Sequence, residues 1–106
     1  MDTGVPNQVD TGLAAKGATQ TTALELALDW NEVLTTPVGD GVRLIAMQPG
    51  QAQTVFNGGA NTLKVYPPSG AKIDALATDA AYSLAAGKTQ IYCCYSTTQI
   101  RSVQLG

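Results

Sequence analysis

The stretch "NGGANTLKVYPPSGAKI", residues 57–73, combines turn residues, two adjacent prolines and an alternating apolar pattern. The segment "NGGAN" predicts a hairpin, because Asn and Gly tolerate the positive φ angles that tight turns require. In "TLKVY", Leu63 and Val65 alternate with polar neighbours, so this strand is expected to have one core face and one polar face. Pro67 and Pro68 then end the strand, since neither can donate a backbone N–H. These features predict two tight corners on a small all-β protein and require no ligand.

Strand-like segments separated by turn signals continue on both sides of this stretch. From Thr21 the chain reads "TALELALDWNEVLTT", where Leu24, Leu26 and Leu28 alternate strictly, and this alternation favours a strand over a helix. Turn signals recur at intervals of roughly 8 to 12 residues, which is typical of a sandwich or barrel. We therefore predict a single-domain, small antiparallel β-sandwich or barrel. Beyond residue 36 the expected strands are 42–47, 51–57, 62–66, 81–85, 89–96 and 99–105.

Residues 1–19 differ from the rest of the chain, because they hold several turn residues and few apolar ones. We predict that they form an extended N-terminal arm outside the core, and that residues 20–106 form the β domain. An arm of this kind either frays in isolation or becomes ordered along another subunit.

The composition is unusually neutral. Hydrophobic residues make up 44% of the 106 residues and charged residues only 13%, whereas a typical globular domain has roughly 25% charged residues. A neutral surface suits a protein that is covered by neighbours. The net charge of −2 and the scattered basic residues argue against nucleic-acid binding. Membrane insertion and export are also not expected, since the apolar runs are much shorter than the about 20 residues of a bilayer span and no signal peptide is visible.

No motif in the sequence predicts a catalytic residue, a cofactor or a metal site, and we do not expect an enzyme. The chain has no His, which removes the commonest general base and the usual serine triad. Two carboxylate pairs lie close in sequence, Asp29 with Glu32 and Asp74 with Asp79. Each pair lies beside turn residues, where Asp commonly caps backbone groups. We interpret these carboxylates as structural.

The adjacent cysteines Cys93 and Cys94 lie within a predicted strand. Neighbouring side chains in a strand point to opposite faces, so one thiol is expected to face the core and the other to face away. We interpret both as small apolar side chains, because free Cys is commonly buried.

Trp30 and Tyr66 are possible surface aromatic contacts. An exposed aromatic ring can stack on a sugar, although aromatic residues on alternating strands more often belong to a core or an interface. A carbohydrate-binding module therefore stays open as an alternative.

Residues 48–103, "QPGQAQTVFNGGANTLKVYPPSGAKIDALATDAAYSLAAGKTQIYCCYSTTQIRSV", resemble a family of small all-β proteins encoded among the virion genes of tailed bacteriophages. The shared features are a "PG" turn, an "N-x-G-A" hairpin, a "VYPP-x-G" corner, an "AAG" turn and a final "S-T-x-W/I" strand, in this order. The family usually has an aromatic residue near the last strand, where this chain has Ile100. The resemblance does not cover the N-terminal arm, and it implies no catalytic residues.

The resemblance implies a capsid decoration, or cement, protein on the exterior of a phage head. Such a protein would be made in the host cytoplasm, form a homotrimer and clamp neighbouring copies of the major capsid protein. The arm would add as a strand to the edge of a capsid sheet, with Val5, Pro6, Val9 and Leu13 as capsid contacts. A tail, collar or fibre-base component is an alternative, and so is a carbohydrate-binding adhesion module on the virion.

Overall fold

The computed structural model describes residues 8–105 and shows an all-β protein, as predicted. The expected strands 89–96 and 99–105 coincide with two of the observed ones. The strands are β1 (Val9–Ala14), β2 (Leu24–Glu25), β3 (Trp30–Thr35), β4 (Gly41–Arg43), β5 (Ala52–Asn57), β6 (Leu63–Tyr66), β7 (Lys72–Ile73), β8 (Tyr82–Leu84), β9 (Thr89–Ser96) and β10 (Gln99–Leu105).

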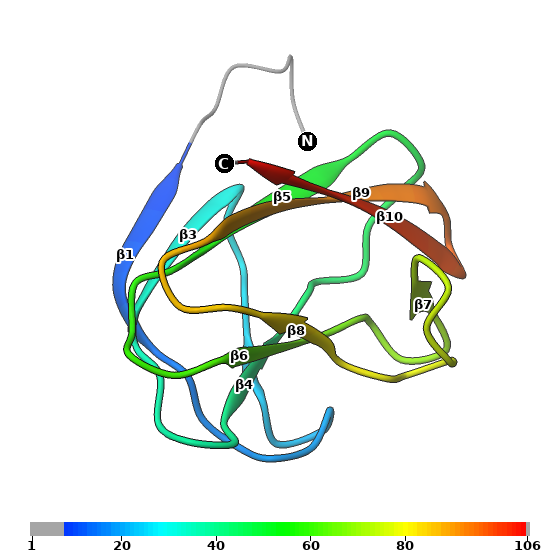
Figure 1. The fold of residues 1–106 in the computed structure, drawn as a ribbon. Coiled ribbons are helices and arrows are strands. Elements are labelled where there is room, and N and C mark those ends of the chain that lie inside the picture. Colours follow the sequence, from blue (N-terminus) through cyan, green and yellow to red (C-terminus); the bar gives the residue numbers. More distant parts are fainter. Residues whose placement is uncertain (1–7, 106) are drawn as a thin grey trace.

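The strands form two sheets that face each other across the core (Figure 1). The six-stranded sheet has the order β1-β3-β5-β9-β10-β7, and the four-stranded sheet has the order β2-β4-β6-β8. From β1 to β6 the chain alternates between the two sheets. Each new strand pairs in parallel with the strand that lies one turn before it. The protein is therefore a short β-solenoid of about four turns, with parallel and antiparallel pairs mixed.

Residue pairing shows how the turns of the solenoid stack. Val9 pairs with Trp30, and Trp30 pairs with Thr54 in the next turn. One turn therefore takes roughly 20 residues, which is at the short end of the periods that solenoid repeats use. Parallel pairing in register points the corresponding side chains of β1, β3 and β5 in the same direction.

The last part of the chain runs in the opposite direction. Strand β8 lies antiparallel to β6, and β9 lies antiparallel to β5. Strands β9 and β10 form an antiparallel hairpin, and the far side of β10 pairs in parallel with β7. This reversal closes the end of the solenoid opposite β1.

The antiparallel sandwich or barrel predicted from the sequence is wrong. Alternation and turn spacing indicate where strands begin and end, but they do not distinguish a chain that doubles back from one that crosses to the opposite sheet. The segment "NGGAN" illustrates the error, because it crosses from β5 to β6 in the other sheet instead of forming a hairpin. Neither Gly58 nor Gly59 has a positive φ. A Cβ at Gly59 would lie 2.5 Å from Thr36 Oγ1, so glycine is needed there for close packing.

The core lies between the two sheets and is mainly aliphatic. Four amide side chains also point into it, on Asn31, Gln53, Asn57 and Gln90. The buried apolar cluster consists of Ala15, Leu26, Val33, Val42, Leu44, Met47, Val55, Leu63, Val65, Ala71, Ile73, Leu84, Tyr92, Cys94 and Ile100.

The side chain of Asn57 holds the crossing from β5 to β6 in place. Its Oδ1 accepts hydrogen bonds from Thr36 Oγ1 at 2.8 Å and from the Gly59 N–H at 3.1 Å. Its Nδ2 donates to the carbonyl oxygens of Asn61 at 2.8 Å and Leu84 at 2.9 Å. One buried amide therefore satisfies backbone groups in the β5–β6 connection and at the end of β8.

Residues 9–15 of the predicted N-terminal arm, residues 1–19, belong to the domain. Strand β1 pairs with β3 and forms one edge of the six-stranded sheet. Leu13 packs against the core, and Ala15 is buried in it. An edge strand has a single neighbour and needs few apolar residues, so its sequence does not stand out from a loop. Val5 and Pro6 lie outside the described residues.

Candidate interaction surface

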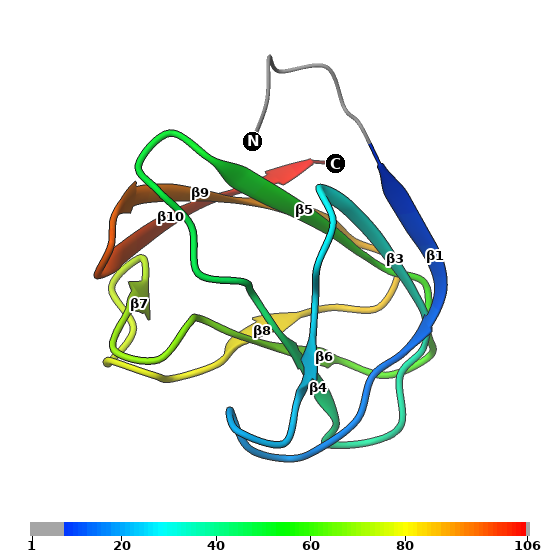
Figure 2. The ribbon, with the colours of Figure 1, turned by 180° about the vertical axis from the view of Figure 1, so that it is seen from behind.

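The outer side of the six-stranded sheet faces away from the four-stranded sheet (Figures 1 and 2). Along β3, the buried side chains of Asn31 and Val33 point inward, so Trp30, Glu32 and Leu34 point outward. The same alternation on the neighbouring strands adds Val9, Ala52, Thr54, Phe56, Thr89, Ile91, Cys93, Tyr95, Arg101, Val103 and Leu105. We call these fourteen side chains the outer face.

Strand pairing arranges most of these side chains in three rows across the sheet. The first row is Ala52, Cys93 and Arg101; the second is Val9, Trp30, Thr54, Ile91 and Val103; the third is Glu32, Phe56, Thr89 and Leu105. The second row crosses five strands without interruption by a charge. The outer face is therefore a continuous and mostly apolar surface.

The exposed large hydrophobic side chains of the described chain gather on the outer face. Five of the six belong to it, and the sixth, Val38, lies in the connection between β3 and β4. Val103 is 58% exposed and Tyr95 is 69% exposed. Contiguous apolar patches are uncommon on monomeric proteins and mark interaction sites. The five are Val9, Leu34, Tyr95, Val103 and Leu105.

Glu32 and Arg101 are the two charged residues of the outer face. The carboxylate of Glu32 accepts hydrogen bonds from Thr11 Oγ1 at 3.0 Å and from Trp30 Nε1 at 3.3 Å. The guanidinium carbon of Arg101 lies 5.5 Å from the centre of the Tyr95 ring. Glu32 is on β3 and Arg101 is on β10, in different rows. The outer face therefore has one acidic and one basic corner.

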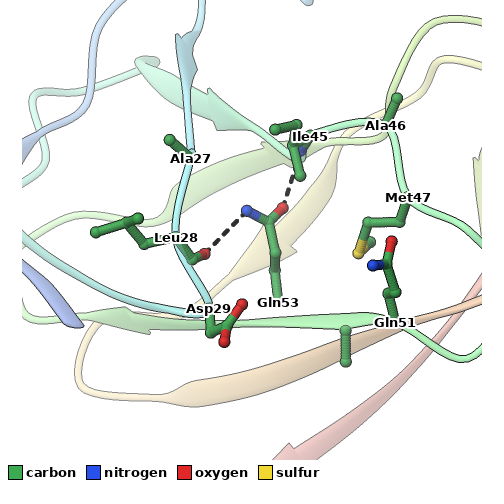
Figure 3. A pocket seen from close by; sticks show the side chains of 9 residues that line it. Ala27, Leu28, Asp29, Ile45, Ala46, Met47, Gln51 and Gln53 are labelled. Atoms are coloured by element: carbon green, nitrogen blue, oxygen red, sulfur yellow. Dashed lines mark hydrogen bonds between the residues drawn. The ribbon is translucent and has the colours of Figure 1, made fainter. Parts of the chain in front are cut away.

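A separate cleft of about 340 Å³ lies between the β2–β3 and β4–β5 connections (Figure 3). The Gln53 side chain bridges these two connections. Its Nε2 donates to the carbonyl oxygens of Leu26 at 2.9 Å and Leu28 at 3.0 Å, and its Oε1 accepts from the Ile45 N–H at 2.9 Å. The backbones diverge here, and the amide replaces direct pairing between them. The lining residues are Ala27, Leu28, Asp29, Ile45, Ala46, Met47, Gln51, Ala52 and Gln53.

The chemistry of this cleft is limited. Its volume is at the lower end of the range for small-molecule sites, about 300 to 1,000 Å³. The hydrogen-bonding groups of Gln53 are occupied by backbone, and Asp29 provides the one carboxylate of the lining. Within residues 8–105, no three His, Cys, Asp or Glu side chains are close enough to hold a metal ion. We assign no reaction to the cleft.

The carboxylates of the second predicted pair bind backbone N–H groups. Asp74 and Asp79 have left-handed φ angles of 51° and 66°. The Asp74 carboxylate accepts hydrogen bonds from the N–H and the Oγ of Ser102. The Asp79 carboxylate accepts from the Gly70 N–H at 2.7 Å and from Gln20 Nε2 at 3.0 Å. Capping of backbone groups by these residues, as predicted from the sequence, is confirmed.

The two predicted aromatic contacts have different positions. Tyr66 is only 8% exposed, and its hydroxyl donates to the Ala18 carbonyl at 2.9 Å. Its assignment as a surface contact was wrong, because the chain before β2 covers the end of β6. Trp30 lies in the second row of the outer face. Of the predicted capsid contacts in the described range, Val9 also lies on the outer face, whereas Leu13 packs against the core.

Cys93 and Cys94 point to opposite faces, which confirms the prediction for them. Cys94 is buried, Cys93 is half-buried on the outer face, and both thiols are free. Burial raises the pKa of the Cys94 thiol. Burial, with smaller contributions from Tyr82 and Asp74, also raises the pKa of Tyr92.

The cluster of apolar side chains on the outer face was not predicted from the sequence. In "AQTVFN" of β5, the alternation alone does not say whether Phe56 or Asn57 faces the core. The same ambiguity holds for Ile91 and Gln90 in β9. Apolar residues are usually assigned to the core, so this general rule would place Phe56 and Ile91 on the inner face, where the structure has Asn57 and Gln90.

No family model, no curated protein and no solved structure matches this chain. Across residues 8–105, the structure contains no helix with the length and apolar character to cross a membrane.

Proposed function

We propose that this chain is a structural protein of a tailed-bacteriophage particle. In this proposal it is a decoration protein that binds the outer surface of the head and clamps neighbouring subunits of the major capsid protein. The observation that carries the proposal is that, among residues 8–105, five of the six exposed large hydrophobic side chains gather on the outer face. A neighbour that covers such a surface removes its apolar side chains from water, and an assembled particle supplies neighbours.

The low charge of the chain supports the same role. Charged residues make up 13% of the sequence, and the outer face has two of them among fourteen side chains. Proteins that work as separate molecules commonly keep apart through surface charge. A neutral surface removes that repulsion and favours contacts with other subunits.

The resemblance of residues 48–103 to small phage virion proteins supplies the biological context. This segment includes β5, β9 and most of β10, three of the five strands that form the outer face. The turns shared with the phage proteins therefore connect strands that form the outer face.

Adhesion in this proposal depends on the outer face, and not on a donated arm. Strand β1 is already paired with β3, so residues 9–14 are part of this chain's own sheet and only the free edge of β1 could pair with a capsid strand. A register shift and Gly12, with a φ of 70°, also make the free edge of β1 irregular. Irregular edges discourage the addition of a further strand. Val9 contributes through its side chain on the outer face.

The test is uptake of the purified protein by particles assembled without it. We expect the protein to sediment with these particles and to raise the temperature at which they release DNA. The variant Val103→Asp, on the outer face, should reduce uptake at least about tenfold, because it places a charge in the apolar surface. Val38→Asp is the matched control, since Val38 is exposed outside that face.

Two results would count against this proposal. If the chain is missing from purified particles, or if it does not sediment with particles that lack it, it is not a decoration protein. Electron microscopy of particles carrying labelled protein locates it on the particle. Label on the tail, collar or fibre base would replace the capsid role with a role in that structure.

A further inference from the structure

The two charged corners of the outer face have a defined separation. Glu32 and Arg101 are three strands apart, which is about 14 Å for strands spaced by about 4.8 Å. They are also two rows apart, which is about 13 Å at about 3.3 Å per residue. The line that joins them therefore runs at roughly 45° to the strands. Its midpoint lies between Thr54 and Ile91, in the second row of the outer face.

The diagonal line from Glu32 to Arg101 allows the outer faces of two copies to pair with each other. A two-fold axis in the plane of the contact, perpendicular to the diagonal at its midpoint, places Glu32 of one copy opposite Arg101 of the other. The contact occurs twice, because the axis also exchanges the two copies. The strands of the two sheets then cross at about 90°, which is one of the two preferred arrangements for packed sheets.

We propose that a second copy of this chain covers the outer face in this two-fold arrangement. The contact pairs opposite charges at both ends and buries apolar side chains between them. The inference deepens the proposed function and rests on it for its biological role. The neighbour that covers the outer face is a second copy of the chain, so the outer face contributes to capsid adhesion by forming the dimer, and surfaces outside the contact touch the capsid. A single patch that pairs with itself requires a two-fold dimer, so this assembly differs from the trimer implied by the sequence resemblance.

The sizes of the facing side chains agree with this arrangement. On the same grid, the two-fold axis places Trp30 of one copy over Ala52 and Cys93 of the other. The bulkiest side chain of the outer face thus lies against two of its smallest. Aromatic side chains in such positions commonly provide much of the binding energy of an interface.

Pairing through the outer face would also explain how the protein clamps a capsid. Each dimer would present two identical copies of every surface outside the contact. Two weak attachments on one rigid dimer act together, because the first raises the effective concentration of the second. A dimer could therefore bridge two capsid subunits that a monomer could not hold together.

Light scattering and sedimentation equilibrium of the purified chain test the pairing without particles. We expect a mass of twice 10.9 kDa at high protein concentration and dissociation on dilution. Val103→Asp should weaken dimerisation at least about tenfold, and Val38→Asp should leave it unchanged. Circular dichroism establishes that both variants are folded. A monomer at all concentrations, a trimer, or a dimer unaffected by Val103→Asp would overturn the inference.

A charge exchange tests the register of the two copies. Glu32→Arg and Arg101→Glu should each weaken dimerisation at least about tenfold, because each brings two like charges together. The double variant restores the opposite charges in the reverse order. We therefore expect its dissociation constant to return to within about threefold of the original. A double variant that is no better than either single variant would contradict the proposed pairing of Glu32 with Arg101.

Thiol labelling of the unmodified protein gives an independent measurement. Trp30 of the second copy should cover Cys93, so labelling of Cys93 by a water-soluble maleimide should slow as the protein concentration rises. Cys94 should stay unlabelled in the folded protein, because it is buried. A Cys93 labelling rate that does not depend on concentration would overturn the inference. A dimer that particles do not take up would count only against the proposed function, and a monomer that they take up only against the dimer.

Discussion

The two faces of the six-stranded sheet depart at several positions from the usual distribution of polar and apolar residues. The inner face has buried amides on Asn57, Gln53 and Gln90. The outer face has Phe56 and Ile91 next to them in sequence. The comparison teaches that polarity alone does not identify the core of this protein. Each of these buried amides makes at least one hydrogen bond, and the lack of a neighbour within the chain leaves apolar side chains of the outer face exposed.

The inner amides of Asn57 and Gln53 are explained by the connections of the solenoid. Each time the chain crosses between sheets, it leaves backbone N–H and C=O groups that no strand pairs with. Buried backbone groups of this kind need partners, because an unpaired one costs about 1 to 3 kcal/mol. Asn57 and Gln53 provide such partners at two different crossings. At these two crossings, a buried amide supplies the hydrogen bonds that strand pairing does not.

The largest expected effect comes from removing one inner amide. Asn57→Leu keeps the size of the side chain but leaves four hydrogen-bonding groups without their partner. We expect the free energy of unfolding to fall by roughly 4 kcal/mol, since each unsatisfied buried group costs about 1 to 3 kcal/mol and some will find water. Urea unfolding at a protein concentration where the chain is monomeric measures it.

The matched control for this change is Thr54→Val, on the same strand. Thr54 lies on the outer face, so the substitution should change stability by no more than about 0.5 kcal/mol. If Asn57→Leu costs less than about 1 kcal/mol, the amide is not what holds the crossing and the contrast between the two faces loses its main support.

The same contrast explains which parts of the fold could be predicted from the sequence. Alternation and turn residues located β5, β6, β9 and β10 closely, because these features depend on local chain geometry. The solenoid path was missed, since it depends on which sheet the chain enters after each corner. Only Asn57, just before "GGAN", marks the crossing in the sequence, and an Asn at that position is equally typical of a hairpin. The outer face was missed for the related reason that burial of Phe56 and Ile91 is the ordinary expectation.

A smaller effect compares the two faces along one strand. Ile100 and Val103 both lie on β10, where Ile100 is buried and Val103 is exposed. Ile100→Ala should lower the free energy of unfolding of the monomer by about 3 kcal/mol, through lost burial and a cavity in the core. Val103→Ala should change it by no more than about 0.5 kcal/mol. Thermal or urea unfolding of both variants tests the difference.

Dimerisation should show the reverse order for these two positions. Val103→Ala removes apolar surface from the proposed contact and should weaken dimerisation, whereas Ile100→Ala leaves the outer face intact. Equal losses of monomer stability at the two positions would show that Val103 is part of the folding core, and the distinction between the faces would then fail on β10.

The smallest expected effect concerns a polar group on the inner face that has no partner. The Tyr92 hydroxyl is buried, and among the described residues no group hydrogen-bonds to it. Tyr92→Phe removes this unpaired group, while the edge-on contact with the Tyr82 ring is kept. At neutral pH we expect stability to stay the same or to rise by up to about 1 kcal/mol. A loss greater than about 1 kcal/mol would mean that the hydroxyl has a hydrogen-bond partner in the folded protein.

Alkaline pH sharpens this test, because burial raises the pKa of Tyr92 in the folded state. The neutral phenol is favoured by folding, so its contribution to stability is present below the unfolded pKa of about 10 and is lost as the pH rises above it. One such group lowers stability by about 1.4 kcal/mol for each pH unit beyond that point. Tyr92→Phe should therefore lose less stability than the original chain between about pH 10 and pH 11. Parallel urea unfolding series at these pH values measure the difference, and identical slopes would show that Tyr92 ionises in the folded protein as readily as in the unfolded chain.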